Sequence, residues 1–288
     1  MRVAIGLGSN LGSRAAYLSA AIDSLSSSEA VNVVARSALY QTDAVGPPQP
    51  RFCNAVVLVE TMLPLRALFD RCKQIEHDLG REPGPRWGPR VVDLDLVVAD
   101  VVHAEPDLAV PHPEAASRAF VLAPLADVWP DSPLSARPFV SPQRVPWPLV
   151  EPVDHTADIG LRAVAPDESD LLAVLADGLV DVVLDRRTIS ESLRVDLRIT
   201  GGDDGGDTED RIVSLLSEIV SRFDAEGLAP RRTLVRSVEG NVVHAVVRGE
   251  TFDPARHIAR TAVKAVTYHG LRVERSDDGL SCTVILDL

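Results

Sequence analysis

Apolar and polar positions along the first half of the chain predict strands and helices in alternation. Apolar residues at helical spacing predict two helices, over 13–25 and 63–79. Ser13 can cap the first, and the second has Pro64 in its first turn and Gly80 after its last. Strands are predicted over 3–8, 31–42, 52–60 and 91–99. The resulting βαββαβ order is that of a split βαβ, or ferredoxin-like, α+β fold. Residues 101–130 are expected to add irregular and helical segments.

The second half predicts another α+β unit, with one layer of helices on a largely antiparallel sheet. Its helices are expected over 168–184, 208–223 and 254–268, the last opened by Pro254. Its strands are expected over 155–164, 193–200, 233–238 and 241–251, followed by a closing hairpin that turns at Asp277-Asp278-Gly279 and ends at Leu288. The Gly- and Asp-rich segment 201–207 is expected to be a flexible acidic loop.

A proline cluster lies between the halves, and proline at this density breaks helices and central strands. It comprises Pro130, Pro133, Pro138, Pro142, Pro146, Pro148 and Pro152. A length of 288 residues also suits two domains better than one. We therefore expect one domain over 1–130, a proline-rich linker or domain tail over 131–150, and a second domain over 151–288.

Composition narrows the possible functions and the compartment. The net charge is −13, divided into −3 over residues 1–150 and −10 over 151–288, which argues against a protein that coats nucleic acid. No apolar stretch approaches the roughly 18–20 residues of a membrane helix, and the N-terminus does not resemble a signal peptide. Cys53, Cys72 and Cys282 lie far apart in apolar runs without zinc-site spacing, so we expect buried thiols and a cytoplasmic location.

The strongest chemical feature is the strand segment 91–98, which contains Asp93 and Asp95. Alternate residues of a strand share a face, so the two carboxylates point the same way, ~6.5–7 Å apart. Desolvating them without partners is costly, and Mg²⁺, which takes one or two carboxylates plus phosphate oxygens, would offset that cost. The alternative is a polar strand face in water.

The loop just before this strand strengthens the metal interpretation. Residues 81–90 combine glycine and proline with Arg81, Arg86 and Arg90, a set suited to a triphosphate and its metal. A solvated charged loop is the alternative. The glycines at 6, 8 and 12 do not have dinucleotide-fingerprint spacing, and no Walker sequence occurs, so neither a Rossmann site nor a P-loop kinase is expected.

Four segments of residues 1–130 together resemble the 6-hydroxymethyl-7,8-dihydropterin pyrophosphokinase family of folate biosynthesis. They are Gly8-Ser9-Asn10, Phe52-x-Asn54-Ala55, Arg86-Trp87-Gly88-Pro89-Arg90-x-x-Asp93-Leu94-Asp95 and Val110-Pro111-His112. The resemblance implies transfer of the β,γ-pyrophosphoryl group of ATP to the pterin hydroxymethyl oxygen, with release of AMP. Two Mg²⁺ ions would neutralise the phosphates and align donor with acceptor.

The resemblance also implies roles for individual residues. Asp93 and Asp95 would hold the two Mg²⁺ ions, while Arg81, in a mobile loop, and Arg90 would engage the phosphates. The implied ATP-site residues are Trp87, His112 and Arg118, with Glu76, which would contribute to the nucleotide or loop site. The implied pterin-site residues are Thr42, Val45, Phe52, Asn54 and Phe120, with the two phenylalanines stacking on the ring. Taken singly, the phenylalanines could be ordinary core and His112 a structural residue.

The second half has three notable segments. They are His155-Thr156-Ala157-Asp158-Ile159-Gly160, Lys264-Ala265-Val266-Thr267-Tyr268-His269 at the end of a predicted helix, and Val284-Ile285-Leu286-Asp287-Leu288. Asp158, Asp287 and the Leu288 carboxylate could jointly bind Ca²⁺ or Mg²⁺. A solvated chain end and a surface lysine are the alternatives.

Together these segments resemble archease across residues 150–288, with Asp210 and Glu218 of the predicted helix 208–223 also matching. The resemblance implies a module that assists the GTP-dependent RNA ligase of tRNA splicing. In that interpretation Asp158, Asp287 and Leu288 are metal ligands, and Lys264 and Glu218 are functional. For Asp210 and Glu218 the alternative is a solvated helix face. The charge of −10 favours a protein partner over direct RNA binding.

The chain is thus interpreted as a pyrophosphokinase fused to an archease-like module. The expected partners are ATP, the dihydropterin and an RNA ligase, without direct nucleic-acid or membrane binding. Two other hypotheses remain open. The kinase half could be a silent scaffold beside an archease-type accessory module, or the protein could be a metal-dependent binding module unrelated to RNA.

Overall fold

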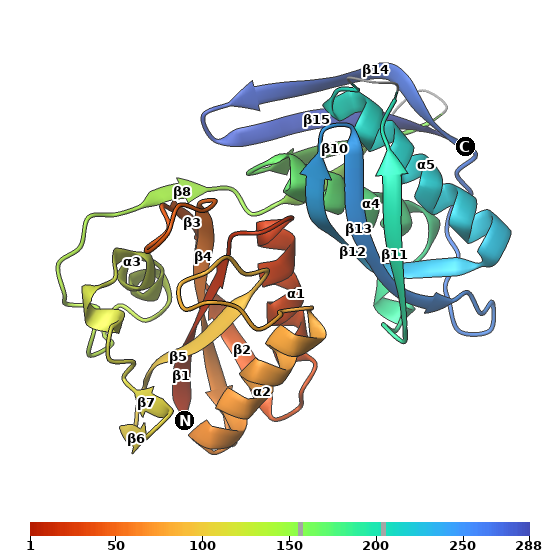
Figure 1. The fold of residues 1–288 in the computed structure, drawn as a ribbon. Helices are drawn as coiled ribbons and strands as arrows, with labels where there is room; N and C mark the ends of the chain where they lie inside the picture. Colours follow the sequence, from red (N-terminus) through yellow and green to blue (C-terminus); the bar gives the residue numbers. More distant parts are fainter. Residues whose placement is uncertain (155–157, 203–205) are drawn as a thin grey trace. The chain divides into compact units, whose positions relative to one another are not determined.

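The computed structural model describes residues 1–154, 158–202 and 206–288, which form two compact units, Met1–Val145 and Pro146–Leu288 (Figure 1). Each unit combines antiparallel sheets with helices. The expected α+β class is therefore confirmed in both.

The first unit is built on one antiparallel sheet with strand order β5-β1-β4-β3-β8, in which β4 also pairs with β2. Its strands are β1 (Arg2–Ser9), β2 (Val31–Arg36), β3 (Leu39–Thr42), β4 (Phe52–Thr61), β5 (Asp93–Ala99) and β8 (Gln143–Val145). This is the expected ferredoxin-like order, except that the strand predicted over 31–42 is two strands. The break falls at Ser37, whose hydroxyl accepts a hydrogen bond from the Val56 N–H at 3.0 Å.

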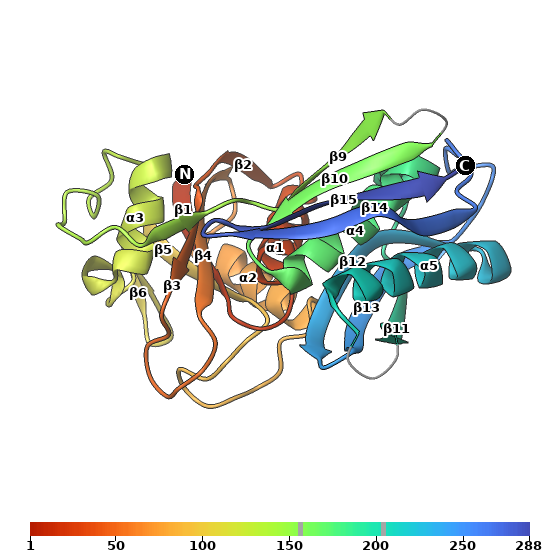
Figure 2. The same ribbon diagram turned by 90° about the horizontal axis from the view of Figure 1, so that it is seen from above.

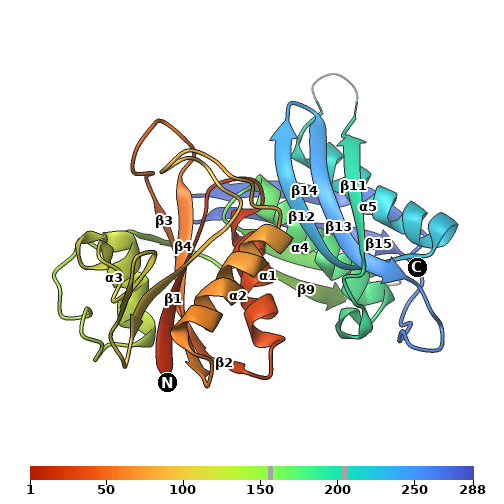
Figure 3. The same cartoon turned by 60° about the horizontal axis from the view of Figure 1, so that its bottom comes forward.

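Helices cover both faces of this sheet (Figure 3). Helices α1 (Arg14–Ser26) and α2 (Leu65–Asp78) lie on one side, and α3 (Ala119–Val128) lies on the other. Helix α3 packs its buried Leu122 and Leu125 against Val56 and Leu58 of β4. Two helix starts differ from expectation: the Ser13 side chain makes no capping hydrogen bond, and Pro64 is at the N-cap, not in the first turn.

The segment after β5 contains a hairpin of β6 (His103–Glu105) and β7 (Leu108–Val110), then the short 3₁₀ helix η1 (Ala115–Ser117) before α3. The proline-rich stretch then returns to the sheet through β8. Arg144 of β8 donates to the Tyr40 hydroxyl at 3.0 Å and to Asp127 at 2.7 Å. Residues 131–145 thus pack in the first unit as a domain tail.

The second unit has two antiparallel sheets where one was expected. Their strand orders are β14-β15-β10-β9 and β11-β13-β12, and helices α4 (Glu168–Val183) and α5 (Thr208–Glu226) lie between them (Figure 2). The strands are β9 (Leu149–Asp154), β10 (Ile159–Ala165), β11 (Leu193–Thr200), β12 (Leu228–Glu239), β13 (Val242–Thr251), β14 (Ala265–Ser276) and β15 (Gly279–Asp287), with the short helix η2 (Arg186–Thr188) after α4.

The helix predicted over 254–268 is wrong. Asp253 accepts two backbone hydrogen bonds, from Arg256 and His257, and so starts one turn. The next N–H groups then bond elsewhere, as when Arg260 donates to Val183 at 2.8 Å. Lys264 therefore directly precedes strand β14 and does not end a helix. Pairing of β14 with β15 overrides the local helical pattern.

Three other expectations concern particular segments. Strand β9 was not expected, but it is an edge strand, where Pro152 is tolerated. Residues 155–157 of the predicted strand 155–164, and 203–205 of the predicted flexible loop 201–207, lie outside the described residues. Within the described ranges, no helix is both long enough and apolar enough to cross a membrane.

All three cysteines, Cys53, Cys72 and Cys282, are buried and free. Burial raises the pKa of both the Cys72 and Cys282 thiols to about 12. Their thiolate forms are therefore scarce at neutral pH, and the thiols are chemically inert packing groups.

Glu250 is expected to make the second unit sensitive to acid. Its carboxylate accepts from the Ser190 N–H at 2.6 Å, from Arg256 and from His257, and these bonds lower its pKa from 4.5 to about 2. As pH falls, this carboxylate therefore takes up a proton in the unfolded protein before it does so in the folded protein. Its contribution to the free energy of unfolding is full above pH 4.5 and is lost as pH falls towards 2.

Urea unfolding between pH 5 and 3 should show a smaller loss in the free energy of unfolding for Glu250→Gln than for wild type. The exposed control Glu274→Gln should follow wild type; equal slopes for all three proteins would contradict the assignment.

Candidate functional site

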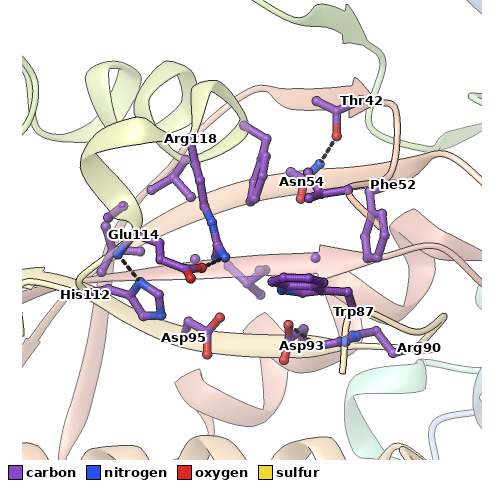
Figure 4. Close-up of a pocket in the computed structure, with 18 of the residues that line it drawn as sticks. Thr42, Phe52, Asn54, Trp87, Arg90, Asp93, Asp95, His112, Glu114 and Arg118 are labelled. Carbon is purple, nitrogen blue, oxygen red and sulfur yellow. Dashed lines mark hydrogen bonds and ion pairs between the residues drawn. The ribbon is translucent and has the colours of Figure 1, made fainter. Parts of the chain in front are cut away.

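A cavity of about 560 Å³ lies in the first unit, within the usual size range of a small-molecule site (Figure 4). Its wall combines the ends of β1, β4 and β5 with the loop 81–90 and the segment from His112 to Val121. Gly8 permits close approach here, because a Cβ at this position would lie 3.3 Å from the Asn54 amide oxygen. The cavity thus joins residues that are far apart in sequence.

Two carboxylates of β5 face this cavity. Asp93 and Asp95, which alternate with the buried Leu94 and Leu96, line the cavity, as strand alternation predicts. One Asp93 oxygen accepts from Arg81 and the other accepts from Arg90 at 2.8 Å. The carboxylate pair is therefore already surrounded by cations.

Glu76 of α2 holds this arrangement from behind. It is 4% exposed, accepts from the Leu94 N–H at 2.7 Å, and pairs with Arg81 at 2.7 Å. Glu76 is absent from the residues that line the cavity, and its ion pair with Arg81 puts it beside the loop, the second of the two places predicted for it. It orients Arg81 and closes the open edge of β5.

Lys73 of α2 was missed by the sequence analysis. Its ammonium donates to Glu76 at 2.7 Å and to the Leu94 carbonyl at 2.9 Å, and lies 3.7 Å from Asp95. Burial lowers its pKa, but Glu76 and Asp95 outweigh burial and raise the pKa above its ordinary value, so Lys73 stays charged. Its i,i+3 spacing from Glu76, in a chain with two lysines, was the available signal.

One end of the cavity suits a flat heterocycle. Asn54 donates to the Thr42 hydroxyl at 2.9 Å, which fixes the orientation of its amide (Figure 4). Phe52, Phe120 and the exposed Val45 line the same cavity and supply apolar surface. The combination of aromatic faces and a fixed amide can stack on a planar ring and bond to its polar edge.

The opposite wall contains His112, Glu114 and Arg118. The Glu114 N–H donates to His112 Nδ1 at 3.2 Å, and burial lowers the His112 pKa, so the imidazole is neutral at pH 7 (Figure 4). Glu114, not expected from sequence, pairs with Arg118 and lies 3.7 Å from Arg86 of the loop. Arg118 lies 5.5 Å from the Phe120 ring centre and therefore near the apolar end.

The loop 81–90 contains an unusual backbone conformation at Trp87, which has a φ of 61° and lines the cavity. Its carbonyl accepts from the Gln49 side chain at 2.6 Å, and Arg86 stacks on its ring at 4.7 Å. Two segments distant in sequence, around Gln49 and Trp87, therefore meet at the cavity mouth.

Of the predicted first-half site residues, all except Glu76 line this one cavity. They are Thr42, Val45, Phe52, Asn54, Arg81, Trp87, Arg90, Asp93, Asp95, His112, Arg118 and Phe120. Within residues 1–154, 158–202 and 206–288, no group of three His, Cys, Asp or Glu side chains is placed to hold a metal. Asp93 and Asp95 fit a hard divalent cation only if another molecule supplies further oxygens.

Asp158, Lys264, Asp287 and Leu288 lie at adjoining ends of β10, β14 and β15. These strands pair Ile159 with Leu286, so extending the register by one residue sets Asp158 opposite Asp287. Lys264 donates its backbone N–H to the Asp287 carbonyl at 2.8 Å and its ammonium to the Leu288 oxygen. Residues 155–157 of the same motif lie outside the described part.

The two acidic residues predicted on α5 have partners of their own. Asp210 forms a capping box with Asp207 and accepts from the Tyr268 hydroxyl at 3.0 Å. Glu218 accepts from Arg222 one turn later at 2.7 Å. Asp210 thus has a role in starting the helix and attaching it to β14.

Two family profiles match the two units separately. The profile of 7,8-dihydro-6-hydroxymethylpterin-pyrophosphokinase matches residues 4–130, and that of the archease protein family matches residues 151–288.

Individual relatives show the same division. A pyrophosphokinase of 2-amino-4-hydroxy-6-hydroxymethyldihydropteridine from Methylorubrum extorquens is 42% identical over 132 residues, covering 45% of this chain and 84% of the relative. An enzyme of the same name from Pseudomonas putida is 45% identical over 113 residues, which cover 39% of this chain and 94% of the relative. Protein archease from Methanopyrus kandleri is 35% identical over 147 residues, covering 50% and 100%.

Proposed function

Because the chain belongs to the dihydropterin pyrophosphokinase family in its first half and to the archease family in its second, we propose that it is a pyrophosphokinase of folate biosynthesis fused to an RNA-ligase accessory module. In the proposed reaction the hydroxymethyl oxygen of 6-hydroxymethyl-7,8-dihydropterin bonds to the β-phosphorus of ATP. The bond between the α,β-bridging oxygen and that phosphorus breaks, AMP leaves, and the hydroxyl proton passes to solvent.

The observation that carries the first activity is the two-ended cavity. Its apolar end, with Phe52, Phe120 and the fixed Asn54 amide, suits the pterin. Its charged end, with Asp93 and Asp95 among arginines, suits a polyphosphate. The cavity wall joins the two ends, so one cavity can bring an acceptor ring and a phosphate donor together.

Asp93 and Asp95 would hold Mg²⁺, which neutralises phosphate charge and aligns the transferred group when bound. Arg81 and Arg90, which pair with Asp93, would then turn to phosphate oxygens. Glu76 limits how far Arg81 moves, because it pairs with the same guanidinium. The neutral His112 can donate through Nε2 to a nucleotide oxygen, because its Nδ1 already accepts from Glu114.

AMP release by the purified full chain tests this proposal directly. With ATP, Mg²⁺ and the dihydropterin, we expect AMP in equal amount to the pyrophosphorylated pterin, and no AMP when the pterin is left out. If the folded wild type forms no AMP, the first unit is a scaffold and the activity proposal is wrong.

The pterin assignment gives a second expected result. Asn54→Ala should raise KM for the dihydropterin ~ten- to a hundredfold, because the site loses the amide that reads the ring edge, with KM for ATP within about twofold of wild type. Steady-state kinetics with each substrate varied would measure both constants. Thr42→Ser, which keeps the hydroxyl partner of Asn54, is the matched control. A change in KM for ATP alone would place Asn54 at the nucleotide.

For the second half, we propose that Asp158, Asp287 and Leu288 bind Ca²⁺ or Mg²⁺ and that Lys264 fixes the strand end beside them. Support comes from the β10–β15 register and from the two hydrogen bonds of Lys264. The full chain should then stimulate guanylylation of a GTP-dependent RNA ligase. Equal guanylylation with and without the chain would overturn this proposal but leave the first activity intact.

A further inference from the structure

Three carboxylates and three cations form one network of ion pairs at the charged end of the cavity, with Glu76 behind the cavity wall. Its carboxylates are Glu76, Asp93 and Asp95, and its cations are Lys73, Arg81 and Arg90. A lone divalent cation therefore meets a neutralised carboxylate pair, and a lone polyphosphate meets neutralised cations. Only the two ligands together bring charges that compensate each other.

Among the three cations, Lys73 is the one held at Asp95. Its distance to Asp95 is 3.7 Å, against 2.7 Å to Glu76 and 2.9 Å to the Leu94 carbonyl. Arg81 and Arg90 pair instead with Asp93.

Lys73 also has little freedom to leave. Glu76 is buried and bonds to the Leu94 N–H, so this carboxylate and the Leu94 carbonyl fix the ammonium from two sides. The ammonium also lies over the face of the Phe69 ring, 5.2 Å from the ring centre. An arginine on the loop 81–90 can follow a phosphate, but Lys73 stays at the floor of the cavity as a fixed charge.

We propose that Lys73 is a positioning residue that makes divalent-metal binding at Asp95 depend on the nucleotide phosphates. Its fixed ammonium repels a metal that arrives alone and attracts the polyphosphate that accompanies the metal. This inference rests on the proposed function of the same cavity. The alternative is that Lys73 only joins α2 to β5, in which case its substitution would change the stability of the fold but not metal binding.

Metal binding to the full chain tests the role of Lys73 without requiring turnover. Mn²⁺ binding would be followed by electron paramagnetic resonance, with and without an ATP analogue that has a methylene group between the α- and β-phosphorus atoms. Wild type should bind Mn²⁺ at least ~tenfold more tightly when the analogue is present. Lys73→Met should bind Mn²⁺ alone more tightly than wild type and lose most of the tightening by the analogue.

Two further variants keep the test decisive. Lys73→Arg, which keeps the charge, should retain the tightening within about threefold of wild type. Gln74→Ala, on the exposed side of the same helix, should match wild type. If Lys73→Met unfolds, Lys73→Gln replaces it, since a neutral side chain there can still bond to Glu76.

The outcomes separate the two proposals. If the charge-neutral variant retains the full tightening and only its melting temperature falls, Lys73 is a structural bridge and the inference is wrong. If wild-type protein forms no AMP, the proposed function fails, whatever the Mn²⁺ result. Active wild type with tightening lost in Lys73→Met and kept in Lys73→Arg supports both.

Discussion

Asp95→Asn is expected to lower AMP formation at least ~a thousandfold, because it removes one of two candidate metal ligands at the transferred phosphate. The amide keeps the size of the side chain, and Asp95 is partly exposed, so the variant should fold like wild type. The substitution also removes the negative charge that lies 3.7 Å from the Lys73 ammonium, so the net charge where the metal would bind becomes more positive.

The measurement is AMP release with Mg²⁺ varied from well below to well above the ATP concentration. Asp70→Asn, an exposed carboxylate on the outside of α2, is the control and should be fully active. Asp95→Asn that is rescued to wild-type rate by higher Mg²⁺ shows weakened metal affinity, whereas a rate that stays low shows a geometric role. A variant with more than about a tenth of wild-type activity at every Mg²⁺ concentration would contradict the assignment.

Asp287→Ala is expected to abolish stimulation of RNA-ligase guanylylation while AMP formation continues at the wild-type rate. Asp287 ends β15 opposite Asp158, and loss of one carboxylate from so small a set of oxygen ligands should weaken a Ca²⁺ or Mg²⁺ site severely. Because Asp287 is exposed and follows the last buried residue of its strand, the fold should persist.

Guanylylation would be measured at fixed ligase and GTP concentrations, with the full chain added in excess. Asp278→Asn, at the exposed turn between β14 and β15, is the matched control. Full stimulation by Asp287→Ala would place the accessory function elsewhere. Joint loss of both activities would instead indicate that the substitution disrupts more than this site.

The sequence predicted the parts of the fold that depend on local alternation. Strand β5 shows this most clearly, since the alternation of side chains along a strand predicted that Asp93 and Asp95 share a face, and the structure buries Leu94 and Leu96 on the other face. The helix predicted over 254–268 failed because long-range partners take its backbone hydrogen bonds: Val183 accepts from Arg260, and β15 pairs with the residues after Lys264. Such pairing cannot be read from a window of neighbouring residues.

For the site, too, local sequence motifs were informative and long-range packing was not predictable. Family motifs identified residues that line the cavity, but they did not distinguish Glu76 from its neighbours. Glu76 lies behind the edge of β5, a position that depends on how α2 packs. Lys73 and Glu114 were missed because their roles come from partners 21 or more residues away along the chain. Lys73 contacts Leu94, and Glu114 contacts Arg86 of the loop 81–90.

The inert cysteines have a practical consequence for observing the loop 81–90. Since Cys53, Cys72 and Cys282 are all buried, a thiol introduced at the surface would react selectively with a maleimide dye. Gly84 is exposed on this loop, and a Cβ there would meet nothing within 4 Å. A fluorophore at Gly84→Cys would therefore report in real time any change in the surroundings of this loop when ATP and the pterin are added, in a chain that needs no prior removal of its own cysteines.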